Sequence, residues 1–462
     1  MGVPPGERVP PSEGEADEAA LRKREQHGWY FYDWACSVYS TSVLTVFLGP
    51  YLTAVAKSAA DADGYVHPLG IPVRAGSFFA YAVSASVVLA ILVMPLAGAA
   101  ADRTGRKKPL LALCAYLGAA ATTGLFFLDG HRYLVGGLLL IVANASMAVS
   151  MVVYNSYLPQ IAPPEERDAV SSRGWAFGYA AGSLVLIVNL VLFTAHDSFG
   201  LSESMAVRIC LASAGLWWGA FTLVPLRRLR DRRTASSASS ASSAPSAPAV
   251  HGWRQLAATI RDMRGKPLTL AFLLAYLIYN DGIQTVISQA SVYGSEELGL
   301  SQSTLITAVL LVQVLAVGGA LGMGRLARIH GAKRTILGSL VAWTLTLGAG
   351  YFLPAGAPVG FFLLAACIGL VLGGSQALSR SLFSHLVPPG KEAEYFSAYE
   401  LSDRGMSWLG PLLFGLTYQL TGSYRDAIVS LVAFFALGFV LLARVPVRQA
   451  VRDAGNPVPE RI

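Results

Sequence analysis

Long apolar segments alternate with short polar breaks along almost the whole chain. Twelve of them are long enough to cross a bilayer as a helix, which takes roughly 20 residues. They are continuous rather than alternating in polarity, and an isolated span satisfies its backbone in lipid only as a helix. The pattern predicts an all-α, polytopic membrane protein with spans at 29–56, 75–101, 109–128, 132–156, 173–195, 205–226, 267–293, 303–324, 333–353, 357–380, 395–420 and 424–444.

The longest polar break separates six spans from six. It starts with a basic run and continues into a Ser/Ala/Pro-rich stretch at 235–250, a composition typical of a flexible linker. The N-terminal residues lack an apolar core, so we expect them to be disordered and not a cleavable signal. The predicted organisation is a disordered cytoplasmic N-terminus at 1–27, a six-helix bundle at 28–226, a linker at 227–266, a second six-helix bundle at 267–444 and a cytoplasmic tail at 445–462.

The second part of the linker has apolar residues at helical spacing. Basic residues lie between them, which predicts an amphipathic helix on an anionic membrane surface. A solvated helix that touches nothing is the alternative. The apolar positions are Trp253, Leu256, Ala257, Ile260 and Met263.

Landmarks of the first half recur in the second half at nearly constant offsets. Chance would scatter the offsets, so the two bundles are expected to share one fold around a pseudo-two-fold axis, with a site between them near the bilayer midplane. The pairs are Gly105 with Gly331 at 226 residues, Pro163-Pro164 with Pro388-Pro389 at 225, and Arg173-Gly174 with Arg404-Gly405 at 231.

A short basic turn joins the second and third spans. A glycine at its start permits close helix approach, a second glycine permits a tight reversal, and an aspartate can accept hydrogen bonds from a helix N-terminus. We expect this turn to latch one face of the protein, although any inner loop is expected to be basic. Its residues are Gly98, Asp102, Arg103, Gly105, Arg106 and Lys107. The second copy has Arg328 in the acidic position and Ala332 in the first basic one, which argues against a gating role there.

Composition and charge support a membrane protein. The chain is 54% hydrophobic and only 14% charged, whereas soluble domains have about 25% charged residues. The net charge of +7 comes from short basic groups between apolar segments, so we do not expect a nucleic-acid partner. Of the 35 Lys and Arg residues, only Lys57, Arg74, Arg132, Arg208 and Arg425 fall on the opposite side from the termini. This asymmetry predicts a multi-pass protein of the cell (inner) membrane with both termini cytoplasmic.

The turn after span two resembles the signature loop of the major facilitator superfamily, in a chain with that superfamily's twelve-span plan. Four further segments resemble the branch that includes the fungal vacuolar amino-acid effluxer. They are Tyr32-Asp33-Trp34-Ala35, Ser171-Ser172-Arg173-Gly174-Trp175, Tyr279-Asn280-Asp281-Gly282 and Gly410-Pro411-Leu412-Leu413-Phe414-Gly415. The resemblance extends from about Gly28 to Arg444. It implies export of amino acids or similar small solutes by rocking of two halves.

Asp281 is the first candidate for substrate binding or ion coupling. If span seven ended before it, too few residues would remain to cross the membrane, so it lies deep. A carboxylate there costs roughly 2.5–3.5 kcal/mol, which predicts that it faces a wet cavity or a partner. Asn280 and Gly282 beside it favour local unwinding that would offer carbonyls to a substrate. The alternative is a buried acid that only pairs with a basic residue. Gln284 is a neutral candidate in the same span.

Other polar residues in or near the spans have two interpretations each. Asp33 and Asn155 are candidate substrate or coupling residues, but Asp33 also suits the first turns of a helix. Arg173 and Arg404 are candidate gate residues. Arg173 can equally anchor the interface, and Arg404 can pair with Glu400 one helical turn before it.

Motifs for enzymatic chemistry are absent from the sequence. No phosphate-binding loop, nucleophile elbow or zinc-binding His pair occurs, and the four cysteines are far apart in apolar segments. We therefore expect no enzyme activity, cofactor or metal. The hypothesis is a secondary active transporter for a small solute, an amino acid or related metabolite, driven by solute or proton gradients, with membrane lipid as its other partner. The alternatives are a transport-inactive receptor or scaffold and, among transporters, a multidrug exporter.

Overall fold

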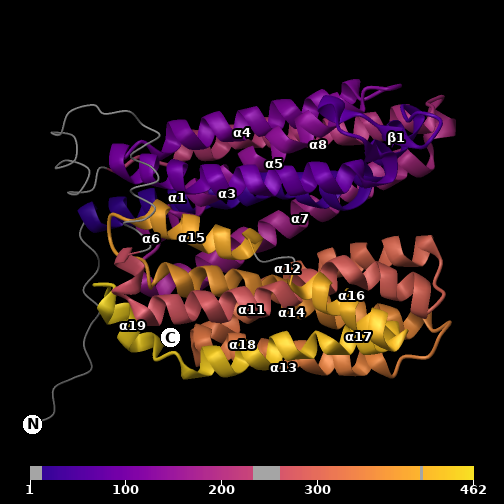
Figure 1. The fold of residues 1–462 in the computed structure, drawn as a ribbon. Coiled ribbons are helices and arrows are strands. Elements are labelled where there is room, and N and C mark those ends of the chain that lie inside the picture. The colour runs from indigo at the N-terminus through magenta and orange to yellow at the C-terminus, as the bar shows by residue number, and fades with distance from the viewer. Residues whose placement is uncertain (1–12, 233–260, 406–408) are drawn as a thin grey trace, which may run out of the picture.

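The computed structural model describes residues 13–232, 261–405 and 409–462 (Figure 1). Most of the predicted amphipathic linker helix, up to residue 260, lies outside these residues. The first twelve residues of the predicted disordered N-terminus also lie outside them.

The first bundle is formed by long helices joined by short turns. Its first span is α1 (Glu13–Val38), which continues through a π-helical stretch, η1 (Tyr39–Phe47), into α2 (Leu48–Ser58). A small antiparallel hairpin follows, with Tyr65 opposite Arg74. The remaining elements are β1 (Tyr65–Val66), η2 (Pro68–Gly70), β2 (Val73–Arg74), η3 (Ala75–Ser77), α3 (Phe78–Thr104), α4 (Lys107–Gly124), η4 (Leu125–Phe127), α5 (Tyr133–Asn155), α6 (Leu158–Ile161), η5 (Pro164–Glu166), α7 (Arg167–Thr194), η6 (His196–Phe199) and α8 (Glu203–Arg228).

The second bundle repeats this plan and is followed by a short helix near the C-terminus. The described parts of its span eleven are α15 and α16, on either side of residues 406–408, and its span twelve is divided into α17 and α18. The elements are α11 (Pro267–Val292), η7 (Tyr293–Glu297), α12 (Gln302–His330), α13 (Ala332–Tyr351), α14 (Pro358–Ser384), α15 (Glu392–Gly405), α16 (Leu409–Thr421), α17 (Tyr424–Ser430), α18 (Val432–Arg444) and α19 (Val447–Asp453).

The predicted fold class is confirmed, because helices occupy all twelve predicted spans. Within the described ranges, ten helical segments are long and apolar enough to cross a membrane by themselves. The other two spans are α13 and the pair α15–α16. The charged first turns of α15 lower its hydropathy. These turns pack against the first bundle.

The prediction of disorder through residue 27 is wrong for its second part. α1 begins at Glu13, and its first turns are rich in Ala, Glu, Leu, Lys and Arg, which have high helix propensity. Tertiary contacts also order this segment. Gln26 is buried and donates hydrogen bonds of 3.0 Å to the Ile161 carbonyl and to Glu166. Local composition predicted disorder in this segment because it does not record these contacts, whose partners are distant in the sequence.

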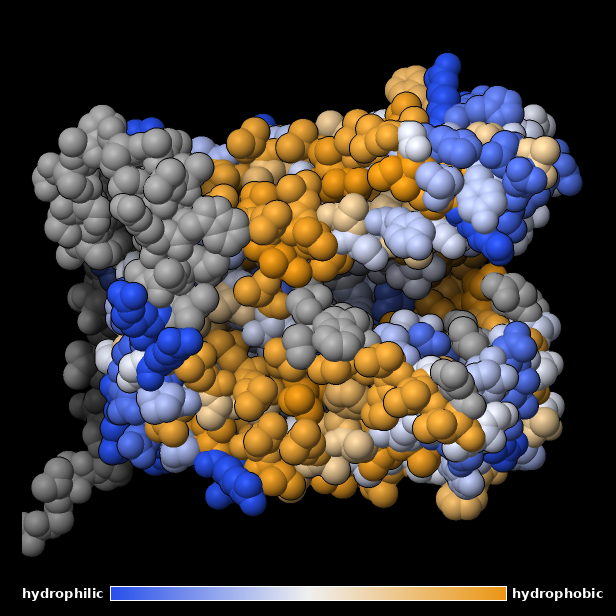
Figure 2. Space-filling model, viewed as in Figure 1, coloured by the Kyte–Doolittle hydropathy of each residue, from blue (hydrophilic) through white to orange (hydrophobic). Residues whose placement is uncertain are grey.

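The two bundles lie side by side with their helices roughly parallel (Figure 1). They meet where α3 packs on α15 and where α7 packs on α12 and α14. On the face shown in Figure 2, apolar side chains cover the middle of both bundles between more polar ends. We call the end with the start of α1, α6 and α19 the terminal end, and the end with β1 the hairpin end.

Matching glycines in the two halves support the predicted repeat. Gly105 and Gly331, at the ends of α3 and α12, both have positive φ, 62° and 89°. Gly98 and Gly324 each lie where a helix of one bundle crosses a helix of the other. A Cβ on Gly98 would come within 2.6 Å of the Ala393 carbonyl of α15, and one on Gly324 within 2.5 Å of Ser172 Oγ of α7. Equivalent positions thus form equivalent helix crossings.

Candidate functional site

A cavity of about 1050 Å³ lies between the two bundles. Its wall comes from both halves and extends from Phe79, Tyr293 and Leu305 near the hairpin end to charged residues deep in the protein. The surface is hollowed between the bundles toward the hairpin end (Figure 2). The deep end carries aromatic rings together with polar side chains, so it combines apolar contact area with orienting groups, as small-molecule sites do.

Arg380 of α14 joins the two bundles at the floor of the cavity. Its guanidinium is 1% exposed, and both terminal nitrogens lie 3.3 Å from Asp33 Oδ2 of α1. It also donates two hydrogen bonds of 2.9 Å to Ser171 of α7, from Nε to the hydroxyl and from Nη2 to the carbonyl. Nη1 lies 3.4 Å from Asn155 Oδ1. One cation of the second bundle is therefore held by three helices of the first.

Aromatic rings surround this ion pair. The Arg380 guanidinium lies 4.6 Å from the ring centre of Trp29 and 5.4 Å from that of Trp175, distances typical of cation–π contacts. Trp29 stacks on Tyr154, whose hydroxyl donates to Asp33 Oδ2 over 2.6 Å. Asp33 is thus held by one ionic and one neutral donor within a largely apolar shell.

Gly174 of α7 provides the space for the pair. A Cβ at this position would lie 2.6 Å from Asp33 Oδ2, 2.7 Å from Trp29 and 3.1 Å from Arg380 Nη2. This glycine, a landmark of the sequence repeat, thus makes room for the charged side chains.

A second set of polar contacts continues along the floor. Asn155 Nδ2 donates to Glu400 Oε1 of α15 over 2.7 Å, which is another link between the bundles. Asn280 of α11 accepts from Gln376 Nε2 over 2.9 Å and donates to Asp403, to which Tyr276 also donates. One set thus links Arg380 through Asn155 to α15, and a second set joins α11, α14 and α15.

Only some of the predicted substrate and coupling residues line the cavity. Asp33, Asn155 and Gln284 line the cavity, whereas Asn280 lies behind Gln376 and Asp403 in its wall. Asp281 is not in the described cavity lining. Its side chain is buried, and its Oδ2 accepts a 2.7 Å hydrogen bond from the backbone N–H of Gly410 in α16.

The predicted unwinding at residues 280–282 is wrong, because α11 runs without a break from Pro267 to Val292. Gly282 serves close packing instead, since a Cβ there would lie 2.9 Å from Phe434 Cβ of α18. Asn280 has side-chain partners and Asp281 Oδ2 accepts from Gly410, whereas Asp281 Oδ1 is buried without a hydrogen-bond partner among the described residues.

Arg380 was not among the residues singled out from the sequence, and Glu400 was named only as a local partner of Arg404. Arg380 falls at the edge of the predicted span ten, where a basic residue is expected from topology, but α14 continues to Ser384. The internal repeat could have pointed to Arg380. The offset of 225 that relates Pro163 to Pro388 also relates Asn155 to Arg380, and these two side chains meet.

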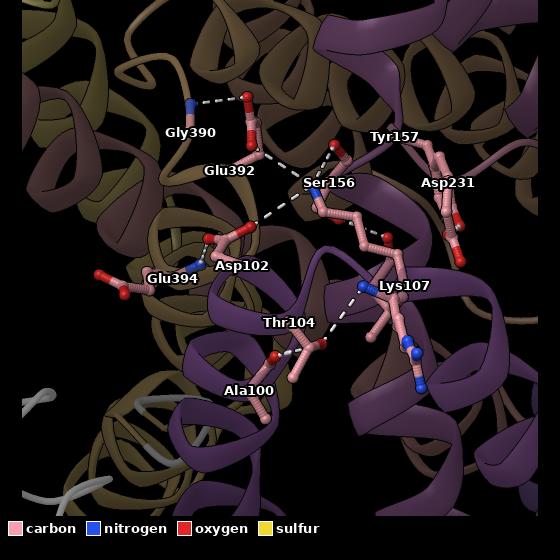
Figure 3. A network of polar contacts seen from close by, with 12 residues as sticks. Ala100, Asp102, Thr104, Lys107, Ser156, Tyr157, Asp231, Gly390, Glu392 and Glu394 are labelled. Carbon is pink, nitrogen blue, oxygen red and sulfur yellow. Dashed lines mark hydrogen bonds and ion pairs between the residues drawn. The ribbon is translucent and has the colours of Figure 1, made fainter. Parts of the chain in front are cut away.

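The turn after α3 lies against the start of α15 at the terminal end (Figure 3). Asp102 Oδ2 accepts from the Glu394 N–H over 2.9 Å, and Lys107 Nζ lies 3.4 Å from Asp102 Oδ1 and 3.3 Å from Glu392 Oε2. Lys107 also donates to the Ser156 carbonyl over 3.4 Å. We call the contacts among Asp102, Lys107, Glu392 and Glu394 the latch. All four side chains are buried.

The other residues of the predicted turn surround the latch. Gly98 brings α3 onto α15, and Gly105 takes the left-handed conformation that reverses the chain. Arg103 and Arg106 are exposed on its surface. Of the two predicted gate arginines, Arg173 is exposed on α7, and Arg404 lies in the last turn of α15.

A further tie connects the end of the linker to α15. Asp262 accepts from the Tyr395 hydroxyl over 2.7 Å and pairs with Lys391 Nζ at 2.9 Å. Burial disfavours its ionisation, but the hydrogen bonds from Tyr395 and Lys391 outweigh burial and lower the pKa of Asp262. Because the folded pKa is depressed, this tie stabilises the fold at neutral pH and is lost as the pH falls through the lowered value.

The contacts between the bundles define the state of the structure. The latch and a hydrogen bond from Arg167 Nη1 to the Ser384 carbonyl over 2.9 Å hold the bundles together at the terminal end. The cavity extends from the Asp33–Arg380 pair toward the hairpin end. The structure is therefore closed at the terminal end and open at the hairpin end.

Comparison with solved structures identifies the fold as that of the major facilitator superfamily. The human organic anion transporter MFSD10 aligns with a TM-score of 0.64 at 15% identity, over 91% of this chain and 99% of that one. The proton:xylose symporter XylE aligns at 0.65 and 16%, over 93% and 96%. A bacterial homologue of the iron transporter ferroportin, in an outward-facing state, aligns at 0.64 and 16%, over 92% and 98%. At these identities the likeness shows the fold alone.

The family described as "Vacuole effluxer Atg22 like" matches residues 21–455, and the chain belongs to it. The chain is 29% identical over 426 residues to the uncharacterized MFS-type transporter YxiO of Bacillus subtilis (strain 168), covering 92% of this chain and 95% of that protein. It is 25% identical over 551 residues to Autophagy-related protein 22-1 of Penicillium rubens, with 95% and 92% covered. The resemblance found in the sequence is confirmed, and the protein is a multi-pass secondary transporter for small molecules.

Proposed function

We propose that the protein carries amino acids or related small zwitterions across the cell membrane by alternating access, and that protons couple to this movement through Asp33. The observation that carries the proposal is the buried Asp33–Arg380 pair, which joins the two bundles at the floor of the cavity. The family's description as vacuole effluxers supports export as the direction.

The chemistry of the pair suits a zwitterion. A guanidinium binds a carboxylate through two parallel hydrogen bonds, so a substrate carboxylate can replace Asp33 on Arg380. The released Asp33 then takes a proton, or it binds the substrate ammonium together with Glu400 across the floor. The rings of Trp175 and Tyr399 on the cavity wall supply apolar contact for a side chain.

Exchange of partners at Arg380 connects binding to rocking of the bundles. Asp33 belongs to the first bundle and Arg380 to the second, so loss of their pairing removes a tie at the pivot of the two halves. Removing one partner of a buried ion pair costs about 3–5 kcal/mol, so the empty carrier resists the change until substrate or a proton compensates the charges. Such a barrier would suppress leakage without cargo.

Charge asymmetry supports an orientation with the terminal end in the cytoplasm. The Lys and Arg residues gather at that end, as the positive-inside rule requires. The structure would then represent the state open to the outside, with the latch closing the cytoplasmic face. Export would begin from the opposite state, in which the latch contacts are broken.

Counterflow in proteoliposomes tests the proposed substrate class. Vesicles loaded with a mixture of unlabelled amino acids are expected to accumulate a labelled amino acid with the wild-type protein. Arg380→Lys keeps the charge but loses the two-pronged geometry, so we expect counterflow to fall by about tenfold or more, because each charge-assisted hydrogen bond contributes about 1.5–3 kcal/mol.

Arg425→Lys is the matched control. Arg425 forms a 2.7 Å pair with Glu297 at the hairpin end, outside the described cavity lining, so this variant should retain wild-type counterflow. Binding of amino acids without counterflow would favour the receptor alternative. Counterflow that only apolar cationic drugs support would favour a multidrug exporter. Equal loss in both variants would contradict a specific role for Arg380.

A further inference from the structure

The two crossings between the bundles at the terminal end differ in charge. The crossing of α3 and α15 is closed by the latch, in which Asp102 accepts from the start of α15. At its counterpart, α12 crosses α7 where Gly324 meets Ser172. The residue of α12 that corresponds to Asp102, at the offset of 226, is Arg328. A cation thus replaces the carboxylate that completes the first crossing.

Three arginines surround a gap of about 100 Å³ at this second crossing. Arg173 comes from α7, and Arg325 and Arg328 come from α12, so both bundles contribute charge. All three are exposed. Among the described residues, no carboxylate oxygen lies within the 4.0 Å of an ion pair from any of them. Three like charges at one crossing favour its separation, yet the structure holds it closed.

We propose that the phosphate of an anionic phospholipid binds among Arg173, Arg325 and Arg328 and completes closure of the terminal end. A phosphate accepts hydrogen bonds from several guanidinium groups at once and neutralises their repulsion. Because its ligands come from both bundles, it would tie α7 to α12 as Asp102 and Lys107 tie α3 to α15.

The surroundings favour a lipid over a free anion. The gap lies at the last turns of α12. Leu321 forms part of its wall, and Leu326 and Ile329 beside it are 44% and 60% exposed. Apolar surface next to a basic cluster fits acyl chains attached to an anionic head group. A free phosphate would leave this apolar surface unused.

The site predicts that anionic lipid stabilises the closed terminal end. The test uses the full chain in nanodiscs of phosphatidylcholine, with and without phosphatidylglycerol, and measures the melting temperature. We expect phosphatidylglycerol to raise the melting temperature of the wild type. The double variant Arg325→Gln/Arg328→Gln should lose most of this rise. Arg444→Gln, which removes an exposed arginine at the end of α18, should retain it.

Two further measurements separate the sources of phosphate and protect against a misfolded variant. Inorganic phosphate and glycerol phosphate, added to phosphatidylcholine nanodiscs, should give no comparable rise. The single variants Arg325→Gln and Arg328→Gln should each reduce the rise, and native mass spectrometry should find fewer retained phosphatidylglycerol molecules on them than on the wild type. An undiminished rise in the glutamine variants, or an equal rise with inorganic phosphate, would overturn the proposal. None of these readouts depends on transport, so failure of the transport hypothesis leaves this test intact.

Discussion

At the scale of single residues, one buried arginine organises the site. Arg380 contacts Asp33, Asn155 and Ser171, which belong to three helices of the opposite bundle. Each partner alone is an ordinary polar residue within an apolar segment. They form a site because all three contact one guanidinium. Gly174, which has no side chain, leaves the space that this group needs.

Gly174→Ala tests whether that space is required. The added Cβ would overlap Asp33 and Trp29, and overpacking of this kind costs about 1–3 kcal/mol and displaces the pair. We expect a lower melting temperature and strongly reduced counterflow. Gly338→Ala in α13 is the control, because nothing lies within 4 Å of its Cβ position. It should be neutral or stabilising by about 0.5–1 kcal/mol with normal counterflow. Similar behaviour of the two variants would show that Gly174 has no special role.

At the scale of elements, most of the fold could be predicted from the sequence, whereas the site could be predicted only in part. Apolar segment length and the repeat predict the helices, because the bilayer imposes both. Asp33, Asn155 and the turn at Asp102 were found because a charge or amide inside an apolar segment is conspicuous. Arg380 was missed because helix α14 extends four residues beyond its apolar stretch. The hydrogen bond from the Gly410 N–H to Asp281 depends on packing between α11 and α16, which no local pattern records.

The latch is an element-scale device that can be tested by charge exchange. Lys107→Glu should break its pairs with Asp102 and Glu392 and destabilise the closed terminal end by about 3 kcal/mol or more, since these charges are buried. That change shifts the equilibrium between the two states by roughly 100-fold. Accessibility of a cysteine placed at Ser37 in the cavity, in a background without other cysteines, should therefore decrease from the hairpin end.

The reverse exchange provides the control for the latch. Adding Glu392→Lys to Lys107→Glu restores one opposite-charge pair, so cysteine accessibility should return toward the wild-type value. The variant Lys333→Glu is a second control, because Lys333, which corresponds to Lys107 in the repeat, donates to the Ala443 and Val445 carbonyls at the end of α18 and forms no ion pair with a described carboxylate. If Lys107→Glu and Lys333→Glu alter accessibility equally, the latch does not set the state.

At the scale of the whole molecule, two similar bundles close one end of a shared cavity and leave the other end open. The deep ion pair and the latch both join the first bundle to the second, so we expect a rocking motion of the bundles to act on both. The second crossing, with its three arginines, makes the two crossings unequal despite the repeat.

Orientation in the membrane is a whole-molecule prediction. In a background without other cysteines, Leu69→Cys at the tip of the hairpin, where the residue is 96% exposed, should react with an impermeant maleimide in intact cells. Arg461→Cys near the C-terminus should react only after the membrane is permeabilised. The opposite pattern would place the terminal end outside the cell.

Solute-driven proton movement measures the central claim most directly. In proteoliposomes containing a pH-sensitive dye, the wild-type protein should move protons when a transported amino acid is added. Asp33→Asn should abolish this proton movement but retain amino-acid exchange, because the amide cannot release a proton and still contacts Arg380. Asp281→Asn, which keeps an oxygen to accept from Gly410, should leave proton movement unchanged. Proton movement that persists in Asp33→Asn, or that is lost only in Asp281→Asn, would contradict coupling at the Asp33–Arg380 pair.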